Sequence, residues 1–505
     1  MGNAPTLHRR DMLLSALMAS ALAALGRART AEAAEATLPV VSSQKFPGQE
    51  VIVVSQTGPV ISGPVQHFSP TWEQATGAKA SLVTYPFGEV FEKLRTALAT
   101  GEYTADLINI TTNWAGDFIG GGFLENVPEA TKKLADFDDY TPIFRSSMTW
   151  QGKTAALVYD GNVHNLFYRR DLFENADYRK KFADQHGYEL TVPATWEQLY
   201  DVGKFFNSFD WSGTGHSYGW LEPIARGNVM EYFLIGRAAS YSKKLGDPHV
   251  FFDPQSMTPR LTEPGWIQAL EDMKKDAECG PKGMIQYGYA ETRPVFVNGQ
   301  SAMIVDWGDI GTLSYSKDSK IRGKTGTALV PGATRLYDRT AKAWAKPADG
   351  VNYAPYLAVT AWMWAVPKSA KNKAAAWDLA AFLCNTRAAE VLVAYPDSGI
   401  QPSRKSSTSP EAVKTLIGAG MDPTDAADWL RAIGKAISHP NAVLDMEIPG
   451  GGEYYNSLDT EASRFLAGEI SAAQAMKNAS DSWQRTTDRL GRDTQRKLYL
   501  AATTA

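Results

Sequence analysis

The sequence lacks the residues that would point to metal or cofactor chemistry. Only two cysteines, Cys279 and Cys384, occur among its 505 residues, and the seven histidines are scattered singly. There is no CxxC, no CxxCH and no closely spaced histidine pair, so no transition-metal cage, haem attachment or iron–sulfur site is visible. Oxidising surroundings would permit a disulfide, but the helical pattern around Cys384 favours two unpaired thiols. We therefore expect no cofactor and no bound metal.

An excess of basic residues and long apolar runs are also missing. The net charge is -4 and no dense basic stripe occurs, which makes nucleic acid a poor candidate partner. Beyond the N-terminus no apolar run approaches the roughly 20 residues of a membrane span. Aromatic residues, in contrast, are plentiful, with 14 tryptophans and 21 tyrosines. Most will pack in the interior, but the excess leaves several to line a binding site.

The N-terminus has the pattern of an export signal. The run HRRDMLL, residues 8–14, opens an apolar stretch that ends near residue 25, and an Ala-Glu-Ala site follows at residues 31–33. Its paired arginines are typical of a twin-arginine signal covering residues 1–33. The alternative is a Sec signal that happens to carry two arginines, and cleavage after Ala36 is also compatible. Either way we expect a soluble protein exported to the periplasm.

Strand and helix patterns alternate through the first part of the mature chain. We predict strands at 50–54, 80–85 and 106–110, a helix at 64–76, and a second helix that carries Val90, Phe91, Leu94 and Leu98 on one face and stops at Gly101. This alternation is typical of a parallel sheet wound with helices. Further helices are predicted at 192–206, 263–278 and 373–385, and residues 409–497 are mostly helical by pattern. The chain is therefore an α/β protein, and its length calls for more than one hydrophobic core.

Six short motifs, taken together, resemble the extracellular solute-binding proteins of ABC importers, in the group that binds sugars and polyols. In chain order they are YRRDLF (168–173), PATWEQL (193–199), FVNGQSAM (296–303), AVPKS with KAAAW (365–377), GIQPSR (399–404) and GEI with AAQAM (468–476). Arg169 and Arg170 stand where the family usually has Asn and Lys. Each motif alone is weak, but their order along the chain makes the resemblance specific.

The resemblance implies a fold, a partner and a substrate class. The expected fold is the two-lobed periplasmic-binding-protein fold of class II type, with a hinge crossed more than once and a helical C-terminal region. Lobe one would hold 48–156 plus 302–357, and lobe two 157–301 plus 358–505. Extra length is expected in 210–260, 310–350 and 405–455. Such a protein would act as a monomer that captures a carbohydrate or polyol and delivers it to the membrane permease of an ABC importer.

A sugar held between two lobes needs flat apolar surfaces and hydrogen-bond acceptors. Its C–H faces stack on aromatic rings, while its hydroxyl groups need polar partners in a mostly dry cleft. Strand ends in α/β sheets point at such a crevice. The predicted strand at 302–305 ends in Asp306, Trp307 and Asp309, which are therefore the first ligand-binding candidates. The alternative is that Trp307 packs into the hinge and Asp309 caps the following helix or turn.

Other candidates follow predicted strands or lie near predicted crossings between the lobes. They are Gln56, Thr57, Trp114, Asp160, His164, Trp220, Glu222, Tyr353, Tyr356 and Arg404. For two of them a structural role is an open alternative, since His164 would also fit as an interior histidine and Arg404 as a loop anchor. Trp362 and Trp364 share one face of a predicted strand, which favours core packing for both.

Two rival functions and one ion site remain open. Asp306 and Asp309 could serve as the carboxylate pair of an exported carbohydrate-active enzyme of the glycoside hydrolase kind. A sensor that contacts a membrane receptor instead of a permease would share the same sequence features. The acidic run DFDD, residues 136–139, would suit a calcium ion or simply a solvated loop. The residues themselves do not identify the ligand.

Overall fold

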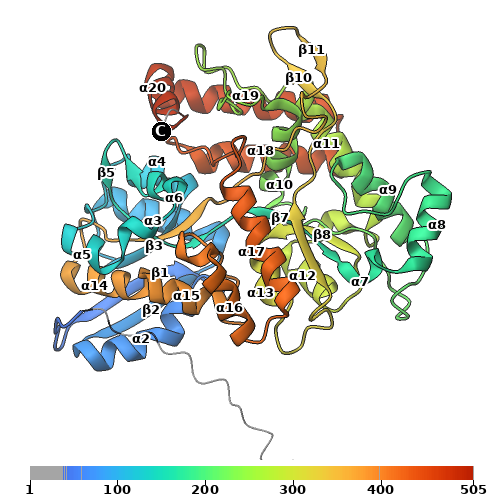
Figure 1. Ribbon diagram of the computed structural model, residues 1–505. Coiled ribbons are helices and arrows are strands. Elements are labelled where there is room, and N and C mark those ends of the chain that lie inside the picture. The colour runs from blue at the N-terminus through green and yellow to red at the C-terminus, as the bar shows by residue number, and fades with distance from the viewer. Residues whose placement is uncertain (1–37, 39, 41, 59, 397, 504–505) are drawn as a thin grey trace, which may run out of the picture. The chain divides into compact units, whose positions relative to one another are not determined.

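Two β-sheets form the centres of two lobes (Figure 1). The computed structural model describes residues 38, 40, 42–58, 60–396 and 398–503, and the predicted signal at 1–33 lies outside them. The first sheet has the order β2 (Lys79–Tyr85), β1 (Glu50–Gln56), β3 (Leu107–Thr111), β12 (Ala361–Ala365) and β6 (Leu157–Gly161). The second has the order β8 (Met303–Trp307), β7 (His164–Arg169) and β9 (Thr325–Leu329).

The first sheet combines parallel and antiparallel pairing. β1 runs parallel to β2 and β3, whereas β12 runs antiparallel to β3 and β6. The predicted alternation of strands and helices is confirmed, and the second helix ends at Gly101, whose φ of +70° suits a residue without a Cβ. The helices of this region are α2 (Gly63–Thr76), α3 (Phe87–Thr100), η1 (Thr112–Trp114), α4 (Ala115–Phe118), α5 (Glu129–Leu134), η2 (Phe137–Asp139), α6 (Pro142–Ser147), α14 (Lys373–Cys384) and α15 (Thr386–Ala394).

The second sheet is antiparallel throughout, with β7 between β8 and β9. Its helices are α7 (Arg170–Phe173), α8 (Ala176–His186), α9 (Trp196–Asn207), α10 (Met230–Ser242), α11 (Pro264–Asp276), η3 (Ala277–Cys279), η4 (Met284–Gln286), α12 (Tyr289–Val297) and α13 (Asp309–Leu313). α9 begins as predicted, because the Thr195 side chain accepts a hydrogen bond from the Gln198 N–H at 3.2 Å.

The predicted helical C-terminal region is confirmed. It contains η5 (Ser406–Thr408), α16 (Pro410–Gly418), α17 (Pro423–Ile437), α18 (Gly451–Leu466), α19 (Ala472–Leu490) and α20 (Arg492–Thr503). α17 packs on β9 through an apolar face that includes the fully buried Trp429, while α18 and α19 pack on α10 and α11 (Figure 1). The segments in which extra length was expected hold α10, β9, α16 and α17, together with a hairpin of β10 (Leu336–Asp338) and β11 (Ala343–Ala345).

Strand pairing contradicts the predicted lobe boundaries in three places. β8 and β9 fall within 302–357, which was assigned to lobe one, yet both pair with β7 in the second sheet. β12 was assigned to lobe two and β6 to the start of lobe two, yet both belong to the first sheet. Hydrophobic patterns identify strands but not their partners, which is why the boundaries were misplaced. The first crossing between the sheets is therefore at residues 162–163.

Several smaller features complete the fold. A short hairpin of β4 (Thr149–Trp150) and β5 (Lys153–Thr154) follows α6. Cys279 and Cys384 are both buried and unpaired, as expected. Within the part of the chain that the structure describes, no helix is both long and apolar enough to cross a membrane.

Candidate functional site

A cleft of about 330 Å³ is lined by residues from both sheets. β1 and β8 contribute their carboxyl ends, as the rule for α/β sheets leads one to expect. β12 contributes its first residues instead, because it runs antiparallel to β3 and so begins where the other strands of its sheet end. The lining side chains used below are Gln56, Thr57, Phe87, Asp160, Asn162, Tyr289, Arg293, Trp307, Asp309 and Trp362.

Aromatic rings provide flat surfaces on both sides of the cleft. On the side of the first sheet, Phe87 lies 6.1 Å from Trp362, and Trp114 packs against both rings from behind. On the side of the second sheet, Trp307 and Tyr289 line the cleft. The Trp307 indole N–H donates to the Ala358 carbonyl oxygen at 2.8 Å, which fixes the ring. Such rings can stack on the C–H faces of a sugar or polyol.

Arg293 of α12 holds two carboxylates at the end of β8. Its Nε and Nη2 donate to the two oxygens of Asp306, at 3.0 and 2.8 Å, and its Nη1 lies 2.9 Å from Asp309 Oδ2. Burial alone would lower the pKa of Arg293, but the two carboxylates outweigh it and raise that pKa. Burial raises the pKa of Asp309 despite the attraction of Arg293. The arginine charge is thus already compensated before any ligand arrives.

Asp160, at the end of β6, is the third carboxylate of the cleft. Its Oδ1 accepts a hydrogen bond from the Gln401 backbone N–H at 2.8 Å. Burial, reinforced by repulsion from Asp309, raises the pKa of Asp160 well above its usual range. Three carboxyl groups, those of Asp160, Asp306 and Asp309, thus accompany the single positive charge of Arg293. The cleft therefore favours a neutral ligand that donates hydrogen bonds over an anionic one.

Five of the predicted ligand-binding residues line the cleft: Gln56, Thr57, Asp160, Trp307 and Asp309. Two more act from behind it. Asp306 is fully buried and contacts Arg293, and Trp114 supports the rings of Phe87 and Trp362. Trp307 both packs at the crossing, beside His164, and lines the cleft, so its position is compatible with either interpretation.

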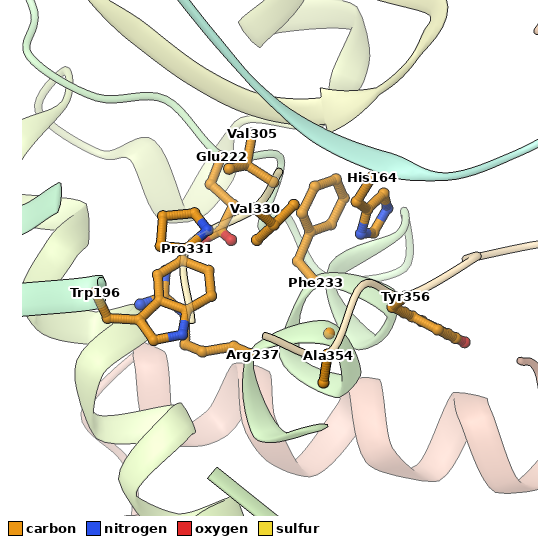
Figure 2. A pocket seen from close by; sticks show the side chains of 11 residues that line it. His164, Trp196, Glu222, Phe233, Arg237, Val305, Val330, Pro331, Ala354 and Tyr356 are labelled. Atoms are coloured by element: carbon orange, nitrogen blue, oxygen red, sulfur yellow. The ribbon is translucent and has the colours of Figure 1, made fainter. Parts of the chain in front are cut away.

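His164 and Glu222 lie elsewhere, around a closed cavity of about 10 Å³ (Figure 2). The His164 ring stacks on Phe233 with 4.2 Å between centroids, and burial lowers the pKa of His164 to about 3. Glu222 contacts Arg237 at 3.2 Å. A cavity of this size has room for about one water molecule. Neither residue lines the cleft of about 330 Å³, and His164 has the surroundings of an interior histidine, which was the alternative.

The remaining predicted residues lie outside the cleft lining and contact other parts of the protein. Trp220 is fully buried away from the cleft lining. Tyr356 is buried and donates to Asp445 Oδ1 at 2.7 Å, while Tyr353 lines a separate pocket beside α17. Arg404 donates to the carbonyl oxygens of residues 135, 136 and 384, so it anchors a loop. Sequence position near a crossing was too coarse to separate such residues from the cleft.

Residues that sequence reasoning missed contribute much of the site. They are Phe87, Asn162, Tyr289, Arg293, Trp362 and, behind the lining, Gln401. Trp362 was assigned to the core together with Trp364, and both are buried; Trp364 stacks on Tyr159, whereas Trp362 also lines the cleft. The antiparallel direction of β12 brings Trp362 to the cleft. Two aspartates at the end of a buried strand require a cationic partner, and this requirement was the signal that could have pointed to an arginine. Nothing in the sequence, however, shows that the partner is Arg293.

The described residues offer no cluster of three or more His, Cys, Asp or Glu side chains that could hold a metal ion. The acidic run at 136–139 has protein partners. Asp139 accepts hydrogen bonds from the Ser406 N–H and hydroxyl, and Asp136 accepts one from the Thr386 N–H. These aspartates thus connect the η2 region to the first residues of α15 and η5.

Comparison with known proteins identifies a family to which this sequence is similar. Residues 71–420 match the family described as bacterial extracellular solute-binding protein. A mannitol-binding protein of Pseudomonas aeruginosa is 24% identical over 426 residues, covering 79% of this chain and 84% of that protein.

Solved structures show the same fold at low sequence identity. An ABC transporter solute-binding protein of Agrobacterium radiobacter in complex with ribitol has a TM-score of 0.69 at 19% identity, covering 88% of this chain and 100% of that one. Maltose-bound MalE3 of T. maritima has a TM-score of 0.68 at 19% identity, covering 87% of this chain and 100% of that one. Because the family match spans well over half of the sequence, the chain belongs to the bacterial extracellular solute-binding proteins.

Proposed function

We propose that this protein captures a neutral carbohydrate or polyol in the cleft and delivers it to the permease of an ABC importer. The single observation that carries the proposal is the composition of the cleft. Trp307 and Tyr289 line it on the side of the second sheet, Phe87 and Trp362 line it on the side of the first sheet, and buried carboxylates lie beside them. Such a cleft suits the ligands named for the similar proteins, which are mannitol, ribitol and maltose.

Ligand binding would work by shifting a conformational equilibrium. A ligand that touches groups on both sheets does so only when the lobes are closed, so its differential affinity favours closure. The permease would then distinguish the loaded form from the empty one. In this proposal the protein is an exported periplasmic monomer, and its N-terminal segment is a twin-arginine signal.

The size of the cleft narrows the substrate. A volume of about 330 Å³ lies at the small end of the range for small-molecule sites, which is about 300 to 1,000 Å³. This favours a single sugar ring or a linear polyol over an oligosaccharide. The compensated charge of Arg293 argues against phosphorylated derivatives, because no free cation remains in the lining to pair with a phosphate.

A thermal-shift screen, followed by calorimetry, tests the proposal. The panel would contain D-mannitol, ribitol, D-glucose, maltose and D-mannitol 1-phosphate. Binding to the folded state alone stabilises it by about 2.7 kcal/mol at 100 times Kd, which raises the melting temperature measurably. We expect a neutral monosaccharide or polyol to give the largest rise and the phosphate ester none. A flat response to every sugar and polyol would overturn the proposal.

The rival enzymatic function is tested by incubating the protein with oligosaccharides and analysing the products. In a glycoside hydrolase the two carboxylates must be free to act on either side of the scissile bond. Here Asp306 and Asp309 both contact the same guanidinium group, and Asp306 is fully buried. This arrangement favours binding over hydrolysis, and we expect no cleavage.

A further inference from the structure

A continuous chain of buried polar side chains runs behind the cleft, and Gln401 lies at its centre. At one end, Arg293 joins Asp306 and Asp309 at the end of β8 in the second sheet. At the other end is Asp160 on β6 in the first sheet. Gln401, which is fully buried, connects the two ends. It comes from the segment between α15 and η5.

The backbone N–H, the Nε2 and the Oε1 of Gln401 all form hydrogen bonds with groups behind the cleft. Its backbone N–H donates to Asp160 Oδ1, and its Nε2 donates to both Asn162 Oδ1 and Asp309 Oδ1, all three at 2.8 Å. Its Oε1 accepts from the Val163 N–H at 3.2 Å. One residue thus binds the Asp160 carboxylate on β6 and the Asp309 carboxylate at the start of α13, as well as the chain that crosses between the sheets.

The surrounding backbone is shaped to hold this amide in place. A Cβ added at Gly308 would lie 2.3 Å from Gln401 Oε1, so any other residue at this position would require the Gln401 amide to shift. Gly308 directly precedes Asp309 and follows Trp307, two of the residues that line the cleft. The close approach therefore fixes Gln401 relative to the ligand-facing end of β8.

We propose that Gln401 is a positioning residue for ligand binding, which fixes the Asp160 and Asp309 carboxylates at the separation needed to receive neighbouring hydroxyl groups of one small polyol or sugar. The inference rests on the proposed function, because it takes the cleft to be the ligand site. Gln401 does not itself line the cleft; it acts through the two carboxylates. Its donors also offset the repulsion between them, since hydrogen bonds favour the ionised form of a carboxyl group.

Two substitutions at this position test the proposal, with D-mannitol as the probe. Gln401→Leu removes the side-chain hydrogen bonds while keeping similar bulk, and we expect Kd to weaken tenfold or more at pH 7.5. Gln401→Glu places an oxygen where Nε2 donates to Asp309. Ionised, it repels Asp309; protonated, it can donate a hydrogen bond again. The ratio of the Gln401→Glu Kd to the wild-type Kd should therefore fall as pH is lowered from 8 to 5.

A matched control separates positioning from general stability. Gln495 is equally buried, with its Nε2 donating to the Pro449 carbonyl oxygen at 2.8 Å, but it lies on α20 outside the cleft lining. Gln495→Leu should lower the melting temperature without changing Kd. If the Gln401 variants behave like this control, with lower stability and an unchanged Kd, Gln401 is only a structural residue and the proposal is overturned.

A ligand-free measurement decides the case even if D-mannitol does not bind. In protein labelled with ¹³C at the aspartate carboxyl carbon, the Asp309 resonance is assigned by its loss in Asp309→Asn. Gln401→Leu should raise the pKa read from that resonance, because a donor to the ionised form is lost. Gln495→Leu should leave it unchanged. An unshifted titration in Gln401→Leu would overturn the inference, whereas absent D-mannitol binding bears on the proposed function alone.

Discussion

Two buried arginines in this protein are each held between two carboxylates, yet their surroundings differ. Arg293 contacts Asp306 and Asp309 and lines a cleft of about 330 Å³. Arg237 contacts Glu222 at 3.2 Å and Asp276 at 2.5 Å, beside a cavity of about 10 Å³. The chemistry of the two clusters is the same, but only the first is accessible to a small molecule.

The difference shows that access, and not residue type, separates a binding cluster from a structural one. The Arg237 side chain is fully buried and stacks on the Trp196 ring at 3.9 Å from its centroid (Figure 2), so its faces are covered by protein. The Arg293 side chain keeps 14% of its surface exposed. Substitutions in the Arg237 cluster should therefore change stability, and substitutions in the Arg293 cluster should change ligand affinity.

The largest expected effect is on stability, from removal of the interior cation. Arg237→Ala leaves Glu222 and Asp276 as buried carboxylates without a partner, which costs about 3 to 5 kcal/mol in the free energy of unfolding. Urea denaturation measures the change. Arg237→Lys keeps the charge and serves as the variant to study if the alanine variant does not fold. A loss below about 1 kcal/mol in both would break the comparison.

A smaller effect, on affinity, is expected from the cleft cluster. Asp309→Asn replaces a charged acceptor by a neutral one, and hydrogen bonds to charged groups contribute about 1.5 to 3 kcal/mol. Isothermal titration calorimetry with the tightest compound of the panel should show Kd weakened by about 10- to 150-fold. The matched control is Asp276→Asn in the interior cluster, which should leave Kd unchanged. Equal affinity losses in both variants would contradict the assignment of ligand binding to the Arg293 cluster and of stability to the Arg237 cluster.

The burial of His164 beside the small cavity should make the stability of the protein depend on pH. His164 has a pKa of about 3 in the folded protein, because it is buried and because Arg293 adds positive charge, against about 6.5 when unfolded. The unfolded state therefore binds more protons as pH falls below 6.5, and stability is lost there at up to about 1.4 kcal/mol per pH unit. His164→Phe keeps a ring against Phe233 and should reduce the fall in melting temperature between pH 6.5 and 5. An unchanged pH profile would contradict burial of a neutral histidine.

The smallest expected effect concerns the aromatic walls. Trp362→Leu removes a ring from the cleft, and aromatic contacts contribute about 0.5 to 1.5 kcal/mol beyond the area they bury. Kd should weaken by up to about tenfold, as measured by calorimetry. Trp196→Leu, in contrast, removes the ring beneath Arg237 and should lower the melting temperature with Kd unchanged. If Trp362→Leu binds as the wild type does, the ring is core packing as the sequence pattern indicated.

Local elements of the fold were readable from local sequence. The run VIVVS in β1, the helical spacing in α3 with its terminal Gly101, and the Thr195 cap of α9 all depend on neighbouring residues, and each prediction is confirmed. The lobe boundaries were not readable in the same way. β8 and β12 each look like a buried strand, and only pairing across more than a hundred residues decides which sheet each joins.

The residues of the candidate site can likewise be divided into those that local sequence predicted and those that depend on distant contacts. Trp307 and Asp309 were predicted because they end a strand whose direction agrees with the general rule for α/β sheets. Trp362 was missed because its strand runs the opposite way, and Arg293 because an ion pair between α12 and the end of β8 leaves no mark on either segment alone. His164 and Glu222 were assigned to the cleft because a buried polar residue looks the same in sequence whether it faces a ligand or a closed interior.

The sequence by itself determined part of the elements, the α/β class and the family, because periodicity, caps and motifs are properties of contiguous residues. The tertiary structure decided strand partners, the members of the cleft and the link through Gln401. These depend on which distant segments meet, and on whether a polar group is covered or left accessible when they do. Both clusters combine one arginine with two carboxylates, and only the packing around them gives one a cavity large enough for a ligand.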